Sequence, residues 1–241
     1  MAYSKDDPKS VQTMFSSIAP RYDMTNLIIS LGLNKYWNRQ LVKHSLSSAP
    51  VGHLLDLCCG TGEIAYGFLN RTKLPQKVHL IDFSENMLVM AKQRAEKLKL
   101  HSKHELTFTQ GDAQAIPLDK DSVACVSIAY GIRNVYDTKK CLAEVLRVLQ
   151  PGGICGILEL TRPKNKVMHQ LHKIYLSTML PLLGKLLTSN QDAYSYLKDT
   201  VGKFIEPEEI AGIMQNTGFR NVRVIPLSFG IAHLIVAEKS I

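Results

Sequence analysis

The ten residues 54–63, LLDLCCGTGE, decide the fold, because an apolar run passes there into a turn with two glycines. A buried strand that enters a helix through a glycine-rich turn is typical of the first unit of an open α/β sheet. The missing side chains of Gly60 and Gly62 allow a ligand to reach the backbone, and the amides of the following helix favour an anionic group there. The stretch therefore predicts a small-molecule site at the end of this strand.

Short apolar runs alternate with helical patterns along the rest of the chain. Seven runs are predicted as strands: 53–58, 77–82, 105–110, 122–129, 152–160, 221–227 and 231–239. The alternation predicts parallel strands joined by crossover helices, near 62–70, 84–99, 138–149 and 207–216. The last two runs lie too close together for a crossover, so they predict an antiparallel hairpin at the C-terminal edge. The residues QPGG at 150–153 predict a turn before the fifth run.

Composition predicts a globular protein, and the length suits one large domain or two small ones, of which we predict one domain. The chain has 241 residues, of which 45% are hydrophobic and 21% are charged. Residues 1–50 and residues 163–200 have helical patterns, and we predict that they form a substrate cap and a lid. A secretory leader and a run of about 18 apolar residues are both missing, which predicts a cytoplasmic protein without a spanning helix. The five cysteines lack metal-ligand spacing, so we expect no metal.

Three acidic residues lie at the ends of predicted strands, at one rim of the sheet: Asp56 inside the end of the first, Asp82 as the last residue of the second, and Asp112 just after the third. Asp82 has the position of a carboxylate that accepts both ribose hydroxyls. Asp56 suits a cationic amino group, and Asp112 suits an adenine amino group. S-adenosylmethionine, which has an amino acid end, a ribose and an adenine, fits all three. A nicotinamide dinucleotide is the rival, because Gly60 to Ala65 also fits G-x-G-x-x-A.

Two longer segments carry a more specific pattern. They are residues 22–37, YDMTNLIISLGLNKYW, and residues 147–161, RVLQPGGICGILELT. Shorter matches lie at residues 130–135, 194–197 and 230–232. By these segments the chain, from about residue 10 to residue 239, resembles the ubiquinone/menaquinone biosynthesis C-methyltransferases. It departs from their pattern at Thr25, Asn34, Gln150, Cys155 and Thr161.

The resemblance implies a class I S-adenosylmethionine-dependent methyltransferase with a Rossmann-like, mostly parallel sheet of seven strands. Such an enzyme transfers a methyl group to a ring carbon of a polyprenylated quinol. We favour the conversion of demethylmenaquinol to menaquinol, and leave a benzoquinol precursor of ubiquinone as the alternative. The residues and the resemblance together predict these cofactor contacts: Asp56, Gly60, Thr61, Gly62, Asp82, Phe83, Asp112, Ala113 and Ala129.

The resemblance also implies a reaction centre at Arg133 and Asn134, with Tyr22 closing the pocket over the ring. An arginine side chain stays protonated in proteins. We therefore predict that Arg133 lowers the pKa of the quinol hydroxyl, or orients a water that removes its proton, and that Asn134 orients this water or the ring oxygen. His169 and His172 are alternative bases, because imidazole titrates near neutral pH.

An isoprenoid tail on the substrate predicts peripheral contact with the inner face of the cell membrane. The aliphatic stretch 174–187 is predicted as a wall for the tail, with Lys164, Lys166, Lys173 and Lys185 near anionic headgroups. The net charge of +8 also raises an RNA methyltransferase as an alternative, but no RNA-binding module is appended and we expect no nucleic acid partner. A nicotinamide-dependent oxidoreductase, a non-catalytic partner protein and a homodimer are left open.

Overall fold

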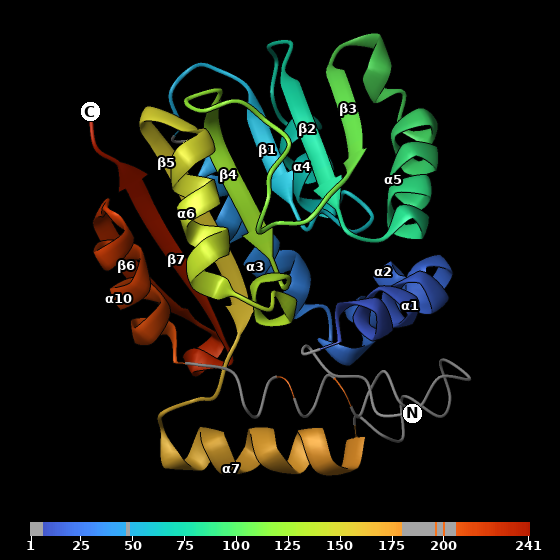
Figure 1. Ribbon diagram of the computed structural model, residues 1–241. Helices are drawn as coiled ribbons and strands as arrows, with labels where there is room; N and C mark the ends of the chain where they lie inside the picture. The colour runs from blue at the N-terminus through green and yellow to red at the C-terminus, as the bar shows by residue number, and fades with distance from the viewer. Residues whose placement is uncertain (1–6, 47–48, 180–195, 197–199, 201–205) are drawn as a thin grey trace.

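Within the described residues, seven strands form one sheet with helices on both faces (Figure 1). The computed structural model describes residues 7–46, 49–179, 196, 200 and 206–241. The strand order is β3-β2-β1-β4-β5-β7-β6. The strands are β1 (Leu54–Leu57), β2 (Lys77–Asp82), β3 (Glu105–Gln110), β4 (Val123–Ala129), β5 (Leu149–Leu160), β6 (Phe219–Leu227) and β7 (Ala232–Lys239). Of these strands only β7 runs against the others, which confirms the predicted α/β class and the antiparallel hairpin.

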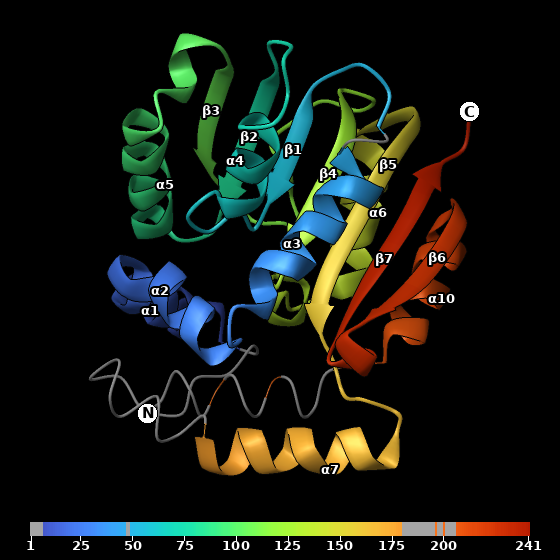
Figure 2. The same cartoon turned by 180° about the vertical axis from the view of Figure 1, so that it is seen from behind.

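The helices divide between the two faces of the sheet. They are α1 (Pro8–Ile18), α2 (Tyr22–Ile29), α3 (Leu33–His44), α4 (Glu63–Leu69), α5 (Glu85–Lys97), α6 (Thr138–Val148), α7 (Lys166–Ile174) and α10 (Pro207–Thr217). The short turns are η1 (Ala19–Arg21), η3 (Leu100–Ser102), η4 (Ile132–Asn134), η5 (Tyr175–Met179) and η6 (Ser228–Gly230). Helices α6 and α10 cover one face (Figure 1), and α3 and α4 cover the other (Figure 2).

Strand β1 is buried on both faces, and its alternating side chains join two separate cores. Leu54 packs in the core beneath α3 and α4, whereas Leu55 and Leu57 pack in the core beneath α6 and α10. A strand buried on both sides reads as a continuous apolar run, as LLDL does. Asp56 therefore points toward the same face as Leu54, under α4.

The predicted turn at residues 150–153 is wrong, because β5 continues through these residues as a bulge. Leu149 pairs with Val123, and the next pair is Ile154 with Cys125, so the extra residues bulge out of the ladder. Gly152 adopts a left-handed φ of +75°, which a glycine reaches without strain. The Pro-Gly-Gly sequence marked an irregular backbone correctly, but the neighbouring strand keeps it inside the sheet.

Helices α1, α2 and α7 lie beyond the carboxyl ends of the parallel strands (Figures 1 and 2). They come from residues 1–50 and 163–200, and their helical character was predicted correctly. That these residues form a substrate cap and a lid stays a prediction. The rest of the lid stretch, including Lys185 and the segment 194–197 apart from Tyr196, lies outside the described residues. None of the helices in the described ranges has the length and apolar character that crossing a bilayer requires.

Helix α6 begins at a strong N-cap and buries one face. The Asp137 side chain accepts a hydrogen bond from the Lys140 amide at 3.0 Å. On the buried face, Cys141, Leu142 and Val145 are fully enclosed. The helix follows β4 and the turn η4, so its start fixes the end of the loop that carries Arg133.

We expect the Asp137→Ala variant to lose about 1 kcal/mol of unfolding free energy, because the amide of Lys140 then lacks its partner. Asp137→Asn keeps an acceptor of equal capping strength, so its stability stays near that of the wild type. Urea unfolding followed by circular dichroism measures both. Equal losses of unfolding free energy in the two variants would show that the capping hydrogen bond does not stabilise the protein.

Candidate active site

Two adjoining cavities lie at the carboxyl ends of the strands. The first spans about 880 Å³, open solvent at its mouth included, and is lined by the ends of β1, β2 and β4, by the loop after β3 and by residues of α1 and α2. The second spans about 1110 Å³ on the same measure and is lined by α2, α3, α7 and the end of β5. Tyr22 and Tyr130 line both cavities, so these two side chains form the boundary between them.

The first cavity contains most of the residues predicted to contact the cofactor. They are Gly60, Asp82, Phe83, Asp112, Ala113 and Ala129. They come from the ends of different strands, which are distant in sequence but meet at one edge of the sheet. The other three predicted contacts, Asp56, Thr61 and Gly62, do not line this cavity.

Asp82 ends β2 and holds the glycine turn in place. One carboxylate oxygen accepts a hydrogen bond from the Gly60 amide at 2.8 Å, and the other accepts one from the Ser84 amide at 2.9 Å. Burial raises the pKa of Asp82, and these backbone bonds oppose the rise. Each oxygen keeps lone pairs for the hydroxyl groups of a ligand. Gly60 has a φ of +53°, and a Cβ there would face the Tyr22 ring at 3.8 Å.

Asp56 is buried below the turn, which corrects the prediction that it meets an amino group. Its side chain is 2% exposed. One oxygen accepts a hydrogen bond from the Ala65 amide at 3.2 Å and the other from the Ser127 hydroxyl at 2.9 Å. The next residue, Leu57, reaches the cavity instead. Asp56 thus fixes the first turn of α4 against β4, and burial raises its pKa to about 7.

Thr61 and Gly62 also support the site from behind. The Thr61 hydroxyl donates to an Asp23 oxygen at 2.5 Å, and the other Asp23 oxygen accepts from Arg94 at 2.7 Å. These bonds attach α2 to the glycine turn and to α5. Gly62 has a φ of +78°, and a Cβ there would lie 2.5 Å from the Tyr66 ring. Its missing side chain therefore serves packing inside the protein.

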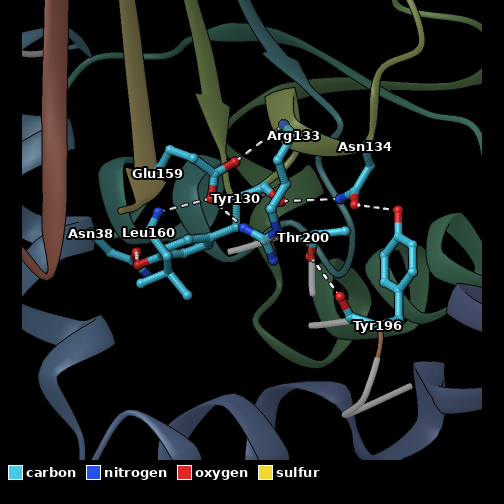
Figure 3. A network of polar contacts seen from close by, with 8 residues as sticks. All are labelled: Asn38, Tyr130, Arg133, Asn134, Glu159, Leu160, Tyr196 and Thr200. Atoms are coloured by element: carbon cyan, nitrogen blue, oxygen red, sulfur yellow. Dashed lines mark hydrogen bonds and ion pairs between the residues drawn. The ribbon is translucent and has the colours of Figure 1, made fainter. Parts of the chain in front are cut away.

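Arg133 lies in the turn η4 after β4 and forms a buried ion pair with Glu159 of β5 (Figure 3). The Arg133 side chain is 7% exposed and that of Glu159 is 2% exposed. Glu159 also accepts hydrogen bonds from the amides of Arg133 at 3.3 Å and Leu160 at 2.8 Å. Burial raises the pKa of Glu159, and the Arg133 charge opposes the rise.

One nitrogen of Arg133 is left for a ligand. Its Nε is buried and has no hydrogen-bond partner among the described residues. Buried donors without partners are rare in folded proteins, because losing water costs more than 1 kcal/mol. Arg133 lines the second cavity next to Tyr22 and Tyr130, so a ligand there is within reach of its guanidinium.

Asn134 forms hydrogen bonds with Tyr130 and Tyr196 beside Arg133 (Figure 3). The Asn134 amide donates to the Tyr130 carbonyl at 3.3 Å and accepts from the Tyr196 hydroxyl at 2.9 Å. The Tyr130 hydroxyl donates to Asn38 at 2.9 Å. Tyr196, from the predicted lid, packs against α1. Asn134 lines the first cavity and Arg133 lines the second, so the two residues of the predicted pair face different cavities.

The structure separates the two histidines that were predicted as alternative bases. His172 is half-buried on α7 and lines the second cavity, whereas His169 is exposed and does not. Burial lowers the pKa of His172. Tyr22, the third predicted catalytic residue, lies at the boundary of both cavities, and burial raises its pKa.

Residues 1–239 match the ubiE/COQ5 methyltransferase family. The chain belongs to this family. Similar relatives include a demethylmenaquinone methyltransferase of Protochlamydia amoebophila, 42% identical with 98% of each chain covered. Another is a demethylmenaquinone methyltransferase of Deinococcus radiodurans, 38% identical over 98% of this chain and 95% of the relative. The "Ubiquinone/menaquinone biosynthesis C-methyltransferase UbiE" of Geobacter sulfurreducens is 35% identical over 96% and 89%.

Solved structures of methyltransferases share the fold. An S-adenosylmethionine-dependent methyltransferase of Thermotoga maritima has a TM-score of 0.64 at 17% identity, with 95% of this chain and 99% of that chain covered. A phosphoethanolamine N-methyltransferase of Haemonchus contortus, bound to S-adenosylhomocysteine, has a TM-score of 0.61 at 19% identity, with 87% and 53% covered. The ubiE/COQ5 enzymes, and this chain with them, are therefore S-adenosylmethionine-dependent methyltransferases with the class I fold.

Sequence reasoning gave no role to several residues of the site. Glu159, Tyr130 and Tyr196 all stand in segments that carried the family resemblance, but their partners are distant in the chain. A signal was present for Glu159, because an acid inside the apolar run GGICGILEL must find a buried partner. Tyr130 has a left-handed φ of +57°, which the sequence does not reveal for a tyrosine.

We expect Glu159→Ala to lower the unfolding free energy by about 3–5 kcal/mol, because it leaves the buried Arg133 charge without its partner. Glu105→Ala is a matched control: it breaks an ion pair with Lys77, but Glu105 is 65% exposed. The control should unfold at nearly the wild-type urea concentration. Similar losses in both variants would contradict a special role of the buried pair.

Asp56 predicts a pH dependence of stability with a definite sign. In the folded protein its pKa is about 7, against 3.8 for an ordinary aspartate. Between these pH values the unfolded chain has lost a proton that the folded chain still holds, so stability falls as the pH rises.

We expect wild-type protein to lose stability relative to Asp56→Asn between about pH 4 and pH 7, by at most about 1.4 kcal/mol per pH unit. The amide can still accept from Ala65 and donate to Ser127, so the comparison removes the charge alone. Urea unfolding at a series of pH values measures the difference. Parallel profiles for the two proteins would show that Asp56 does not titrate in this range.

Proposed function

We propose that this chain transfers a methyl group from S-adenosylmethionine to a ring carbon of demethylmenaquinol, giving menaquinol. The relatives from Protochlamydia and Deinococcus carry the name of that activity. The observation that supports the proposal most is Arg133, which has an unpartnered buried Nε and lines an apolar cavity that adjoins an acid-lined one. Methylation of a benzoquinol precursor is the alternative, since the Geobacter relative is named for both quinones.

The first cavity fits S-adenosylmethionine better than a dinucleotide. Among the described residues that line it there are two carboxylates, Asp82 and Asp112, and no lysine, arginine or histidine. A pyrophosphate would meet these carboxylates without a compensating cation, whereas ribose hydroxyls and an adenine amino group would donate to them. When bound, S-adenosylmethionine supplies an electrophilic methyl group on a positively charged sulfur. Phe83, which is 39% exposed at the cavity, offers an apolar face for the adenine.

The second cavity supplies what a quinol needs to become a nucleophile. A ring carbon attacks well only after a neighbouring hydroxyl loses its proton. The Nε of Arg133 donates a hydrogen bond to that oxygen and stabilises its negative charge, which lowers the pKa of the quinol hydroxyl. His172 accepts the proton, because it is the titratable base near neutral pH among the described residues that line this cavity. Tyr22 and Tyr130 hold the ring between the two cavities and exclude water.

The same proposal places the enzyme in the cytoplasm, at the inner face of the membrane. A polyprenylated quinol partitions into the bilayer, and the aliphatic residues Leu160, Leu171 and Leu176 line the second cavity where its tail would begin. A homodimer stays a prediction from the sequence.

The test is an anaerobic assay of the purified protein with S-adenosylmethionine and a reduced, short-tailed demethylmenaquinol. Mass spectrometry should find the product heavier by one methylene unit. A benzoquinol precursor in a parallel reaction should be converted more slowly. In cells, deletion of the gene should cause demethylmenaquinone to accumulate, and an unchanged quinone profile would overturn the proposal.

We expect Arg133→Gln to lower kcat by about 10²–10³-fold, the usual effect of removing one donor to a developing oxyanion. The double variant Arg133→Gln with Glu159→Gln keeps the pair neutral and hydrogen-bonded, and it controls for damage to the fold. Calorimetry should show that both variants bind S-adenosylmethionine with nearly wild-type affinity, since Arg133 does not line the first cavity. Wild-type kcat in the double variant would remove Arg133 from the mechanism.

A further inference from the structure

Large apolar side chains face solvent on the segments that line the second cavity and on the turn next to it. We call them the apolar rim: Leu31, Leu33, Val167, Leu171, Ile174 and Phe229. Leu31, Leu33 and Leu171 line the cavity itself. Val167, Leu171 and Ile174 follow at spacings of four and three, so they form one stripe on α7. Figures 1 and 2 show α7 beyond the carboxyl ends of the parallel strands.

Two members of the rim are held outward by backbone that is unfavourable for them. Leu31 has a φ of +52° and is 75% exposed, and Phe229 has a φ of +59° and is 80% exposed. A bulky residue with positive φ is a genuine outlier, and glycine or asparagine would adopt it at lower cost. At both positions the backbone conformation is unfavourable and a large apolar side chain is exposed. Neither feature stabilises the fold.

The turn that carries Phe229 is fixed on both sides. The Trp37 indole donates to the Ser228 hydroxyl at 2.8 Å, and the Thr161 hydroxyl donates to the Gly230 carbonyl at 3.0 Å. Trp37 and Ile231 line the second cavity, so the turn sits at its edge. Phe229 is thus presented to solvent by a clamped backbone.

The charge around the rim selects an anionic partner. Residues 164–179, KNKVMHQLHKIYLSTM, contain Lys164, Lys166 and Lys173 and no acid. Lys164 is paired with Glu208, so Lys166 and Lys173 supply the charge of this segment. Lys35, in the first turn of α3 beside the cavity-lining Asn34, adds another cation. Two copies that met through this surface would bring like charges together, whereas anionic lipid headgroups would attract it. An apolar stripe flanked by lysines is also the pattern of helices that lie in the bilayer interface.

We propose that the apolar rim is a membrane-docking surface, which inserts Phe229, Leu31 and the α7 stripe into an anionic bilayer. The mouth of the second cavity then opens into the lipid, and a lipid-borne acceptor enters it without crossing water. The purpose of this surface rests on the proposed function, but its binding to lipid is measurable without any methyl transfer.

The test is flotation of the full-length protein with vesicles of phosphatidylcholine, alone or mixed equally with phosphatidylglycerol. We expect binding to the mixed vesicles, and weaker binding to phosphatidylcholine alone or at high salt. Phe229→Asn should lower the partition coefficient at least about tenfold, because it removes a large apolar side chain from the surface that enters the lipid. Asparagine tolerates positive φ, so this variant should fold at least as stably as the wild type. Leu31→Asn should lower the partition coefficient by a similar factor.

Leu74→Asn is the matched control. Leu74 is 69% exposed, but it lies in the loop before β2, at the opposite end of the sheet from the rim. We expect this variant to bind vesicles as the wild type does. Equal binding by Phe229→Asn and Leu74→Asn would overturn the proposal. A second result would also overturn the proposal: a wild type that binds no vesicles and sediments as a dimer, together with a Phe229→Asn variant that sediments as a monomer.

A tail-less, water-soluble naphthoquinol separates this inference from the proposed function. Phe229 does not line either cavity, so Phe229→Asn should methylate this acceptor at the wild-type rate while its activity on vesicle-borne quinol falls. Vesicle binding without methylation of any quinol would refute the proposed function and leave the surface standing. Methylation in solution by a wild type that binds no vesicles would refute the surface alone.

Discussion

The ion pair of Arg133 with Glu159 is the interaction on which the site depends. Moving two charges out of water costs several kcal/mol each, and an apolar pair of equal volume is often as stable. Stability alone therefore does not account for this pair. Glu159 binds both the guanidinium and the amide of Arg133, so the side chain has one orientation. In that orientation Arg133 lines the second cavity and its buried Nε has no partner among the described residues, which is the basis of the role proposed for it.

The two cavities have different structural origins, although they share a tyrosine wall. The ends of the parallel strands build much of the first, together with residues of α1 and α2. Solved methyltransferases of very different sequence share the fold of this chain. Helices α2, α3 and α7 build much of the second, and they lie outside the sheet. Asp23 ties α2 to Thr61 and Arg94, so the N-terminal helices are fixed relative to the glycine turn. Under the proposed function, acceptor choice would depend mainly on the added helices, and cofactor choice mainly on the ends of the strands.

Most of the fold followed from the sequence, because periodicity reports directly on strands and helices. The strand set, the crossover helices and the hairpin were predicted from local patterns. The predictions failed for residues whose role depends on the orientation of the side chain or on a partner distant in the sequence. Asp56 points under α4 because side chains alternate along a strand, and Thr61 turns to Asp23, which is 38 residues away. Likewise, nothing local pairs Glu159 with Arg133, or Tyr196 with Asn134.

The most direct measurement is a crystal structure of the protein with S-adenosylhomocysteine and a short-tailed demethylmenaquinol. The account predicts the nucleoside beside Asp82 in the first cavity. It predicts the quinol in the second cavity, with a ring oxygen within hydrogen-bond distance of Arg133 Nε. A quinol bound elsewhere, or an Arg133 that has left Glu159 and points away from the ring, would contradict it.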